Sequence, residues 1–261
     1  MRLEKDGIAI TCLKDWQRLA PPKSPDQWVE GRSAYEVANA WCGATGPAVP
    51  ECLRALFETA DLIRGLEVEL AVPEHRIRFD DHGGEPRNAD LALVGHAAGL
   101  RVAVTVEAKA DEPFGASVAQ TMAAALERLL QNPQSRGVRR VEDLVRALLT
   151  HHATGLPPVG ELRYQLLTAA AGTLAYAIAE GADTAVLVVH EFLTDKTKDH
   201  LHDRNAEDYR AFLRRLGGED QLDAKQCSLA GPFLVPGAPV FQNAPPLLVG
   251  KVSTNRRALG I

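Results

Sequence analysis

Two carboxylates and a lysine interrupt a stretch, residues 88–115, that otherwise predicts two adjacent strands. Asp90 opens the first apolar run, and the second run ends in Glu107-Ala108-Lys109. The two-residue period of a strand places Glu107 and Lys109 on one face, and a hairpin would bring Asp90 close to Glu107. Carboxylate oxygens are the ligands that Mg²⁺ prefers in proteins. The spacing therefore predicts a divalent-metal site at one end of a hairpin.

The acid-x-lysine tripeptide alone is a weak signal, because Asp223-Ala224-Lys225 repeats it. That second copy lies in a polar segment with no strand pattern before it, so we do not interpret it as a site. For Glu107 and Lys109, the alternative to a metal site is a solvated strand end held by a salt bridge. Both interpretations stay open at this level.

Patterned segments on both sides of the hairpin predict the elements that position it. Before it, the S-x-x-E pattern from Ser33 predicts a helix with a capping box, and the alternating run 66–72 predicts a half-buried strand. After it, a second capping-box pattern opens a helix at Ser117, and a long apolar pattern predicts a helix over 162–180. The continuous apolar run 184–189 is typical of a strand covered on both faces. Further expected elements are a strand over 7–13, helices after Pro50 and over 141–150 and 205–216, and short strands within 231–252.

The composition is that of an ordinary globular chain. It has 261 residues, 46% of them hydrophobic, a formal net charge of −5 and four cysteines without C-x-x-C spacing. We expect one domain over residues 1–261, with reduced and mostly buried thiols. The sequence shows no apolar leader and no apolar run of membrane-spanning length, so we expect a cytoplasmic protein that binds no membrane.

The predicted order is helix, strand, strand, strand, insertion, helix, strand. That order, with Asp90 in RNADLALV and Glu107-x-Lys109 in TVEAK, resembles the αβββαβ core of the PD-(D/E)XK nuclease superfamily, the restriction-endonuclease-like fold. Ala89 stands where many members of that superfamily have proline. The segments E-x-K-x-D-E-P-F-G and R-Y-Q-L-L also resemble an uncharacterised bacterial group within or near the superfamily.

The resemblance implies an α/β (α+β) fold with a central mixed sheet flanked by helices. The core would comprise residues 33–110 and 161–192, interrupted by a helical insertion over 111–160. A C-terminal extension over 193–261 would follow. We therefore expect the candidate chemistry to lie within the core, close to the end of the second hairpin strand.

The resemblance also implies a metal-dependent nuclease that cuts DNA in preference to RNA, and a homodimer as its working form. Mg²⁺, with Mn²⁺ as a substitute, would be held by Asp90, Glu107 and the Ala108 carbonyl, with Glu36 as a further ligand. Lys109 would orient or deprotonate the attacking water, and Gln165 would position water or phosphate.

Structural explanations compete with several of these functional ones. Glu36 is accounted for by its capping box, and Gln165 by an exposed helix face. Asp111 and Glu112 either extend the acidic cluster or cap the turn that follows them, and we favour the turn. His190 follows an apolar strand, where a structural histidine is the commoner case.

Two alternatives to a nuclease stay open. The first is a catalytically inactive nuclease-fold protein that acts as a binding or interaction module, which the acidic net charge favours. The second is an enzyme on a small phosphorylated substrate. Arg136, Arg139 and Arg140 form the best local basic cluster, which either contacts phosphates or lies in a solvated loop.

Overall fold

One mixed sheet organises the protein. The computed structural model describes the chain except residues 44–45, 151–153, 219–226 and 258–261, so the second acid-x-lysine copy lies outside the described residues. The strand order is β2-β1-β3-β4-β5-β6-β8-β7. The strands are β1 Arg2–Lys5, β2 Ile8–Ala9, β3 Glu67–Ile77, β4 Arg87–Ala97, β5 Leu100–Lys109, β6 Thr184–Leu193, β7 Leu229–Phe233 and β8 Leu247–Asn255.

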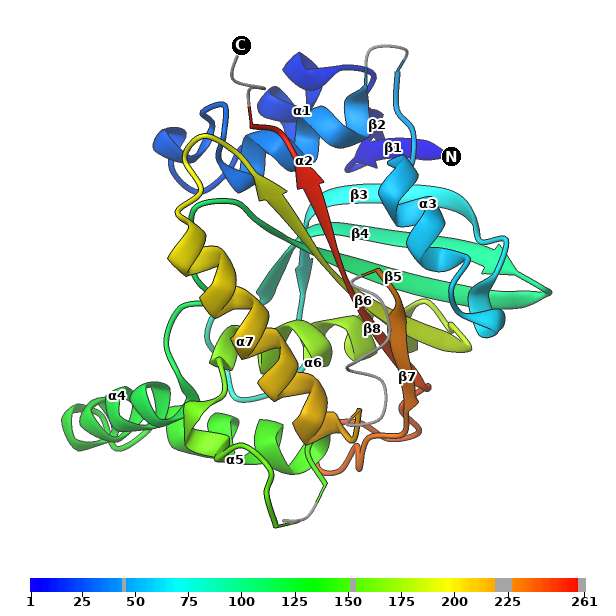
Figure 1. Ribbon diagram of the computed structural model, residues 1–261. Helices are drawn as coiled ribbons and strands as arrows, with labels where there is room; N and C mark the ends of the chain where they lie inside the picture. The colour runs from blue at the N-terminus through cyan, green and yellow to red at the C-terminus, as the bar shows by residue number, and fades with distance from the viewer. Residues whose placement is uncertain (44–45, 151–153, 219–226, 258–261) are drawn as a thin grey trace.

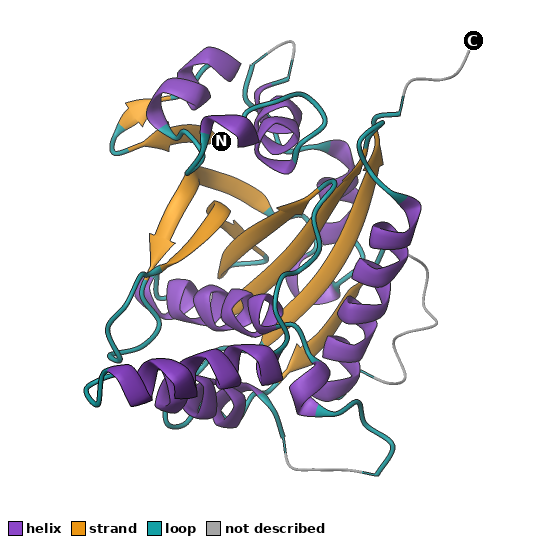
Figure 2. Cartoon of the chain, turned by 90° about the vertical axis from the view of Figure 1, so that its left-hand side faces the viewer, coloured by secondary structure: helices purple, strands orange, loops and turns teal. Residues whose placement is uncertain are grey.

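Helices cover both faces of this sheet (Figures 1 and 2). The helices are α1 Leu13–Leu19, α2 Ser33–Cys42, α3 Glu51–Phe57, α4 Val118–Gln131, α5 Gly137–Leu148, α6 Tyr164–Ala179 and α7 Asp199–Leu216, with 3₁₀ turns at Pro25–Gln27, Asp61–Ile63 and Val159–Glu161. One apolar core lies between the sheet and α1, α2 and α3. The other lies between the sheet and α5, α6 and α7, while α4 packs against α5. The predicted α+β class, with a central mixed sheet flanked by helices, is confirmed.

The predicted hairpin is present as β4 and β5. Its turn is the two residues Ala98 and Gly99, with φ of 49° and 82°. Positive φ at both positions matches the tight turns whose twist suits a hairpin, and glycine adopts it at little cost. His96 and Ala97 therefore belong to β4, and two residues complete the turn.

Side-chain burial follows the layers. β3 alternates buried and more exposed positions, whereas β6 is buried from Thr184 to Phe192 because helices cover both of its faces. The strand continues to Leu193, so His190 and Glu191 lie within it rather than after it. Glu191 in this apolar run is therefore a buried charge, which needs partners.

Helix starts were predicted with mixed success. The capping box at Ser117 is confirmed, with Ser117 and Gln120 bonded to each other's backbone N–H. The one at Ser33 is wrong: the N-cap is Arg32, and the Glu36 carboxylate accepts the Gly31 N–H at 2.8 Å. A turn closed by the Arg32 N–H and the Val29 carbonyl precedes α2. The Glu36 carboxylate therefore bonds Gly31, the residue before the N-cap.

Other boundaries also shift. α5 begins at Gly137 and α7 at Asp199, both earlier than predicted, because polar first turns hide the apolar period of an amphipathic helix. The expected strand over 7–13 is confined to β2, and the chain turns into α1 at Leu13. The expectation of mostly buried thiols is wrong, since Cys42 alone among the four cysteines is buried.

The expected order of the core is present: α2, then β3, β4 and β5, then α4 and α5, then α6 and β6. Residues after β6 do more than extend it. β8 lies in the sheet between β6 and β7 and pairs in parallel with β6 from Ala185 to Leu193 (Figure 1). The C-terminal part of the chain therefore completes the sheet rather than forming an appendage.

Candidate metal centre

The centre forms where β4 and β5 stop pairing. Their register ends at Leu91 and Val106, while β5 continues beside β6 as far as Lys109. Beyond that pair, the Ala108 N–H donates to Asp90 Oδ2 at 2.6 Å, so a carboxylate takes the place of a strand carbonyl. Because the N–H and C=O of one strand residue point to the same neighbouring strand, the Ala108 carbonyl also lies on the β4 side of β5.

Glu107 is the most connected side chain of this group. Its Oε1 accepts hydrogen bonds from Lys109 Nζ at 2.7 Å and from Gln165 Nε2 at 2.6 Å. Its Oε2 accepts from Arg87 Nη2. The Glu107 side chain is 4% exposed and that of Arg87 is 11% exposed, so this is a buried network. The structure thus brings Asp90, Glu107, Lys109 and Gln165 together as predicted.

The side chains of β5 point alternately to the two faces of the sheet, which explains why Glu107 meets α6. Thr105, Glu107 and Lys109 face α6, since Thr105 bonds Thr173 of α6 and Glu107 bonds Gln165, in the first turn of that helix. α6 follows the insertion, which ends where Val118 N–H bonds the Leu162 carbonyl. The insertion therefore returns the chain to the sheet with Gln165 placed over β5.

The two candidate metal ligands, Asp90 and Glu107, have pKa values shifted in opposite directions. Burial and the neighbouring Glu107 carboxylate raise the pKa of Asp90 to about 8. Burial also acts to raise the pKa of Glu107, but Arg87 and Lys109 outweigh it and hold that pKa below its ordinary value. Burial opposes the charge of Lys109, yet Glu107, Glu112 and Asp90 hold its pKa above the ordinary value. Glu107 and Lys109 are thus a charged pair, and Asp90 holds a proton at neutral pH.

Acidic groups outnumber basic ones around this pair. Burial raises the pKa of Glu74 despite its hydrogen bond from Asn88, and it raises the pKa of Glu112 despite Lys109. The Glu112 carboxylate accepts the N–H of Asp111 at 3.1 Å, which lies before the 113–115 segment, so the predicted cap of the following turn stays a prediction. Burial is the largest cause of both raised pKa values, and the nearby lysines do not offset it.

A divalent cation fits this donor set. Within the described residues, no group of three or more His, Cys, Asp or Glu side chains is arranged to hold a metal. Mg²⁺, however, is commonly held by one or two carboxylates together with water and substrate phosphate. Asp90 and Glu107, with the Ala108 backbone beside them, supply that set. A cation between the two carboxylates would offset the burial and the Glu107 charge that raise the pKa of Asp90.

Two further candidates belong to the opposite face of the sheet. Glu36 on α2 bonds Gly31 and lies 3.8 Å from Arg256 Nε, so we leave it out of the ligand set. His190 packs on Phe192 and lies 2.8 Å from Thr254 Oγ1, and burial lowers its pKa to about 3. A neutral, buried histidine of this kind agrees with the structural interpretation.

Arg136 and Arg139 of the arginine cluster line an open pocket of about 790 Å³. Arg140 pairs with Asp80 at 2.7 Å and lies over the Phe79 ring, and Arg136 donates to the Asp81 carbonyl at 3.3 Å. Arg139 lies 3.8 Å from Asp143. The pocket therefore mixes both signs of charge, and it favours neither a nucleic acid nor another partner.

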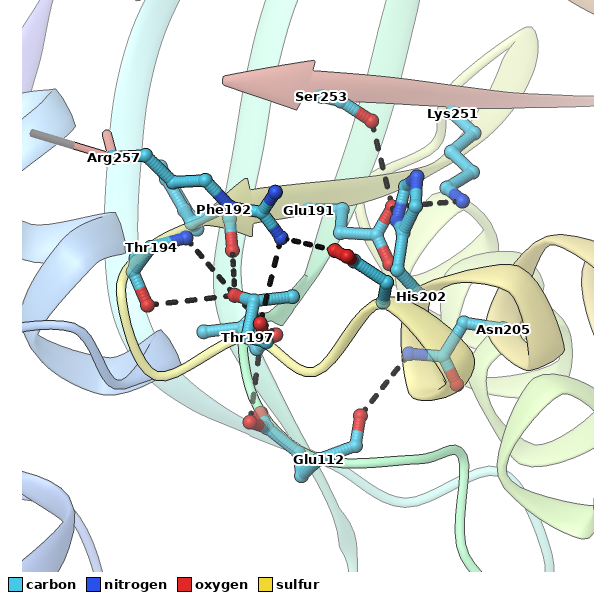
Figure 3. Close-up of polar contacts among 12 residues, drawn as sticks. Glu112, Glu191, Phe192, Thr194, Thr197, His202, Asn205, Lys251, Ser253 and Arg257 are labelled. Atoms are coloured by element: carbon cyan, nitrogen blue, oxygen red, sulfur yellow. Dashed lines mark hydrogen bonds and ion pairs between the residues drawn. The ribbon is translucent and has the colours of Figure 1, made fainter. Parts of the chain in front are cut away.

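Sequence reasoning missed a second buried network, which Figure 3 shows at the ends of β6 and β8. Glu191 Oε2 lies 2.8 Å from Lys251 Nζ and 2.6 Å from His202 Nδ1 on α7, and Ser253 Oγ is 3.4 Å away. The signal was a glutamate inside an apolar strand. Arg87 was missed as well, although it stands three residues before Asp90 on the same strand.

A family model described as "Domain of unknown function (DUF6946)" matches residues 9–256. The chain belongs to this family. Neither the curated proteins nor the solved structures include a match to it. In the part of the DUF6946 chain that the structure describes, no helix is long and apolar enough to cross a membrane. The DUF6946 description assigns no activity, so function has to follow from the site.

Proposed function

We propose that this DUF6946 protein is a metal-dependent nuclease of restriction-endonuclease-like fold, acting on DNA in preference to RNA. The observation that carries the proposal is the meeting of Asp90, Glu107 and Lys109 where β4 and β5 separate. The order of α2, β3 to β5, α6 and β6 supports the same proposal.

Asp90 and Glu107 would hold Mg²⁺ or Mn²⁺, with the Ala108 carbonyl beside them. When bound, the cation would supply a Lewis acid for the phosphate and a hydroxide near neutral pH. The protein's own groups hold this arrangement in place. Lys109 is fixed by its 2.7 Å bond to Glu107 and would orient the attacking water and offset phosphate charge. Gln165, on the helix α6 that covers β5, donates a hydrogen bond to Glu107 and holds it in place.

A second candidate is a non-catalytic binding module on the same fold. It is favoured by one observation: Glu107 already accepts hydrogen bonds from two cationic side chains and an amide. A carboxylate whose two oxygens already accept hydrogen bonds from protein groups can be a purely structural group. Metal-dependent cleavage separates the two candidates.

The test is cleavage of end-labelled single-stranded DNA, duplex DNA and RNA in Mg²⁺, Mn²⁺ or EDTA. We expect the wild type to cleave with a divalent cation only, and Lys109→Ala to be slower by about 100-fold or more, as for loss of a positioned acid–base group. Lys14→Ala, which removes an exposed lysine from α1, is the control and should keep the wild-type rate. Absence of cleavage on all three substrates, or full activity in Lys109→Ala, would reject the proposal.

A further inference from the structure

Arg87 occupies the side of Glu107 that faces away from Lys109 and Gln165. It is the first residue of β4, and its Nη2 donates to Glu107 Oε2, while the other two donors share Oε1. With side-chain exposures of 11% and 4%, the two groups form a buried ion pair. Glu107 is therefore neutralised by the protein before any metal arrives.

α6 has a place for the arginine stem. Gly172 lies within the helix, and a Cβ built there would be 3.1 Å from Arg87 Cγ and 3.7 Å from Arg87 Cβ. Glycine inside a helix costs stability, about 1 kcal/mol relative to alanine. The close approach of Arg87 gives this glycine a physical reason. Gly172 of α6 leaves room for the Arg87 stem, and Glu107 of β5 binds its guanidinium.

A divalent cation and Arg87 would compete for the same carboxylate. Both oxygens of Glu107 already accept hydrogen bonds, and removing one partner from a buried ion pair leaves a costly unpaired charge. A cation that takes the Arg87 position on Glu107 removes that penalty. The guanidinium, once released, is the protein group best suited to grip a phosphate with two parallel hydrogen bonds.

We propose that Arg87 is a positioning residue that weakens metal binding at Glu107 until a substrate phosphate draws the guanidinium away. This inference rests on the proposed function. It makes metal and phosphate binding mutually strengthening, because coupling between two sites is reciprocal. It also explains why no metal-holding cluster stands ready among the described residues.

The test is Mn²⁺ titration calorimetry, without nucleic acid, on the wild type, Arg87→Met and Arg87→Lys. We expect Arg87→Met to bind Mn²⁺ at least about tenfold more tightly than the wild type, within the usual range of coupling between sites. Arg87→Lys, which keeps the charge but loses the fork of donors, should lie between them. Arg101→Met is the matched control, because Arg101 is also on the sheet but pairs with Glu180 at 2.9 Å. It should bind Mn²⁺ as the wild type does.

Thermal unfolding provides a second readout. Loss of Arg87 leaves Glu107 buried without its partner, so we expect a lower melting temperature for Arg87→Met in EDTA and a larger rise on adding Mn²⁺ than in the wild type. If Arg87→Met does not fold in EDTA, Arg87→Lys carries the comparison. Wild-type binding that neither variant tightens would overturn the role of Arg87 while leaving the nuclease proposal intact. Absence of Mn²⁺ binding in all of them would overturn both.

Discussion

Two neighbouring carboxylates behave differently in this site because their surroundings differ. Glu107 is ionised by Arg87 and Lys109, whereas Asp90 keeps its proton because burial and Glu107 oppose its charge. Such separation of paired acids is a recurrent feature of catalytic sites. In the metal-free protein, Asp90 is therefore the group whose ionisation a cation must bring about.

This separation predicts a pH dependence of metal binding. The pKa of Asp90 is raised from 3.8 to about 8, so Asp90 is protonated below about pH 8 and must lose its proton before it can bind a metal. We expect the Mn²⁺ affinity to rise with pH up to about 8 and then to level off. Calorimetry in buffers of different ionisation heat should show about one proton released per Mn²⁺ at pH 6.5 and close to none at pH 9. An affinity that does not change over this range would contradict the assignment of Asp90.

The raised pKa of Asp90 also predicts how the stability of the fold changes with pH. A raised pKa means that the folded state binds the Asp90 proton more tightly than the unfolded state does. The stabilising effect of that proton is complete below about pH 4 and is lost as the pH rises to about 8. In EDTA, the wild type should lose stability over that interval to a greater extent than Asp90→Asn, since the amide does not titrate.

At the residue scale, short-range pattern predicted three of the side chains that meet, and Gln165 followed only from the resemblance to the nuclease superfamily. Strand alternation placed Glu107 and Lys109 together, and the hairpin added Asp90. Arg87 could not be found in this way because a long, flexible side chain reaches across strands. Glu36 is the opposite case: the order of elements suggested it as a ligand, but its carboxylate accepts the Gly31 N–H and lies near Arg256.

At the element scale, the position of β4, which carries Asp90, depends on how it pairs with β3. The β3 register shifts between Val68 and Leu70, and Gly95 of β4 lies at this bulge. A Cβ at Gly95 would collide with the Glu67 carbonyl oxygen, a backbone atom that cannot swing aside. The glycine therefore allows the close approach of the two strands at the bulge, four residues after Leu91, where the pairing of β4 with β5 ends.

Gly95→Ala should accordingly destabilise the fold. We expect the free energy of unfolding, measured in urea, to fall by about 3 kcal/mol, because the substitution forces a backbone shift in a buried sheet. A matched comparison is Gly172→Ala, where the nearest atoms belong to the flexible Arg87 side chain and the effect should be smaller. Equal stability of Gly95→Ala and the wild type would show that the bulge tolerates a side chain.

Elements with strong local signals were predictable, and those defined by distant partners were not. The apolar run of β6, the β4–β5 hairpin and the Ser117 cap all have local causes. The sequence could not show that β8 lies between β6 and β7, because a strand's place in a sheet is decided by non-local pairing.

At the scale of the whole molecule, one sheet holds two buried charge networks on the same side. Lys109 of β5 is the register partner of Glu191 of β6, so the Asp90–Glu107 group and the Glu191 network lie at the same end of neighbouring strands. This is the C-terminal end of β5, β6 and β8, which run in parallel (Figure 1). Open sheets with parallel strands commonly bind ligands beyond the C-terminal ends of the strands.

The measurement that tests the central claim most directly is Mn²⁺ titration calorimetry on the wild type, Glu107→Gln and Glu127→Gln. Glu127 is an exposed glutamate on α4, so its substitution is a control for the loss of one negative charge. We predict that the wild type and Glu127→Gln bind Mn²⁺ with the same affinity and that Glu107→Gln does not bind it. Equal binding by Glu107→Gln, or no binding by the wild type, would contradict a metal centre at the end of β4 and β5.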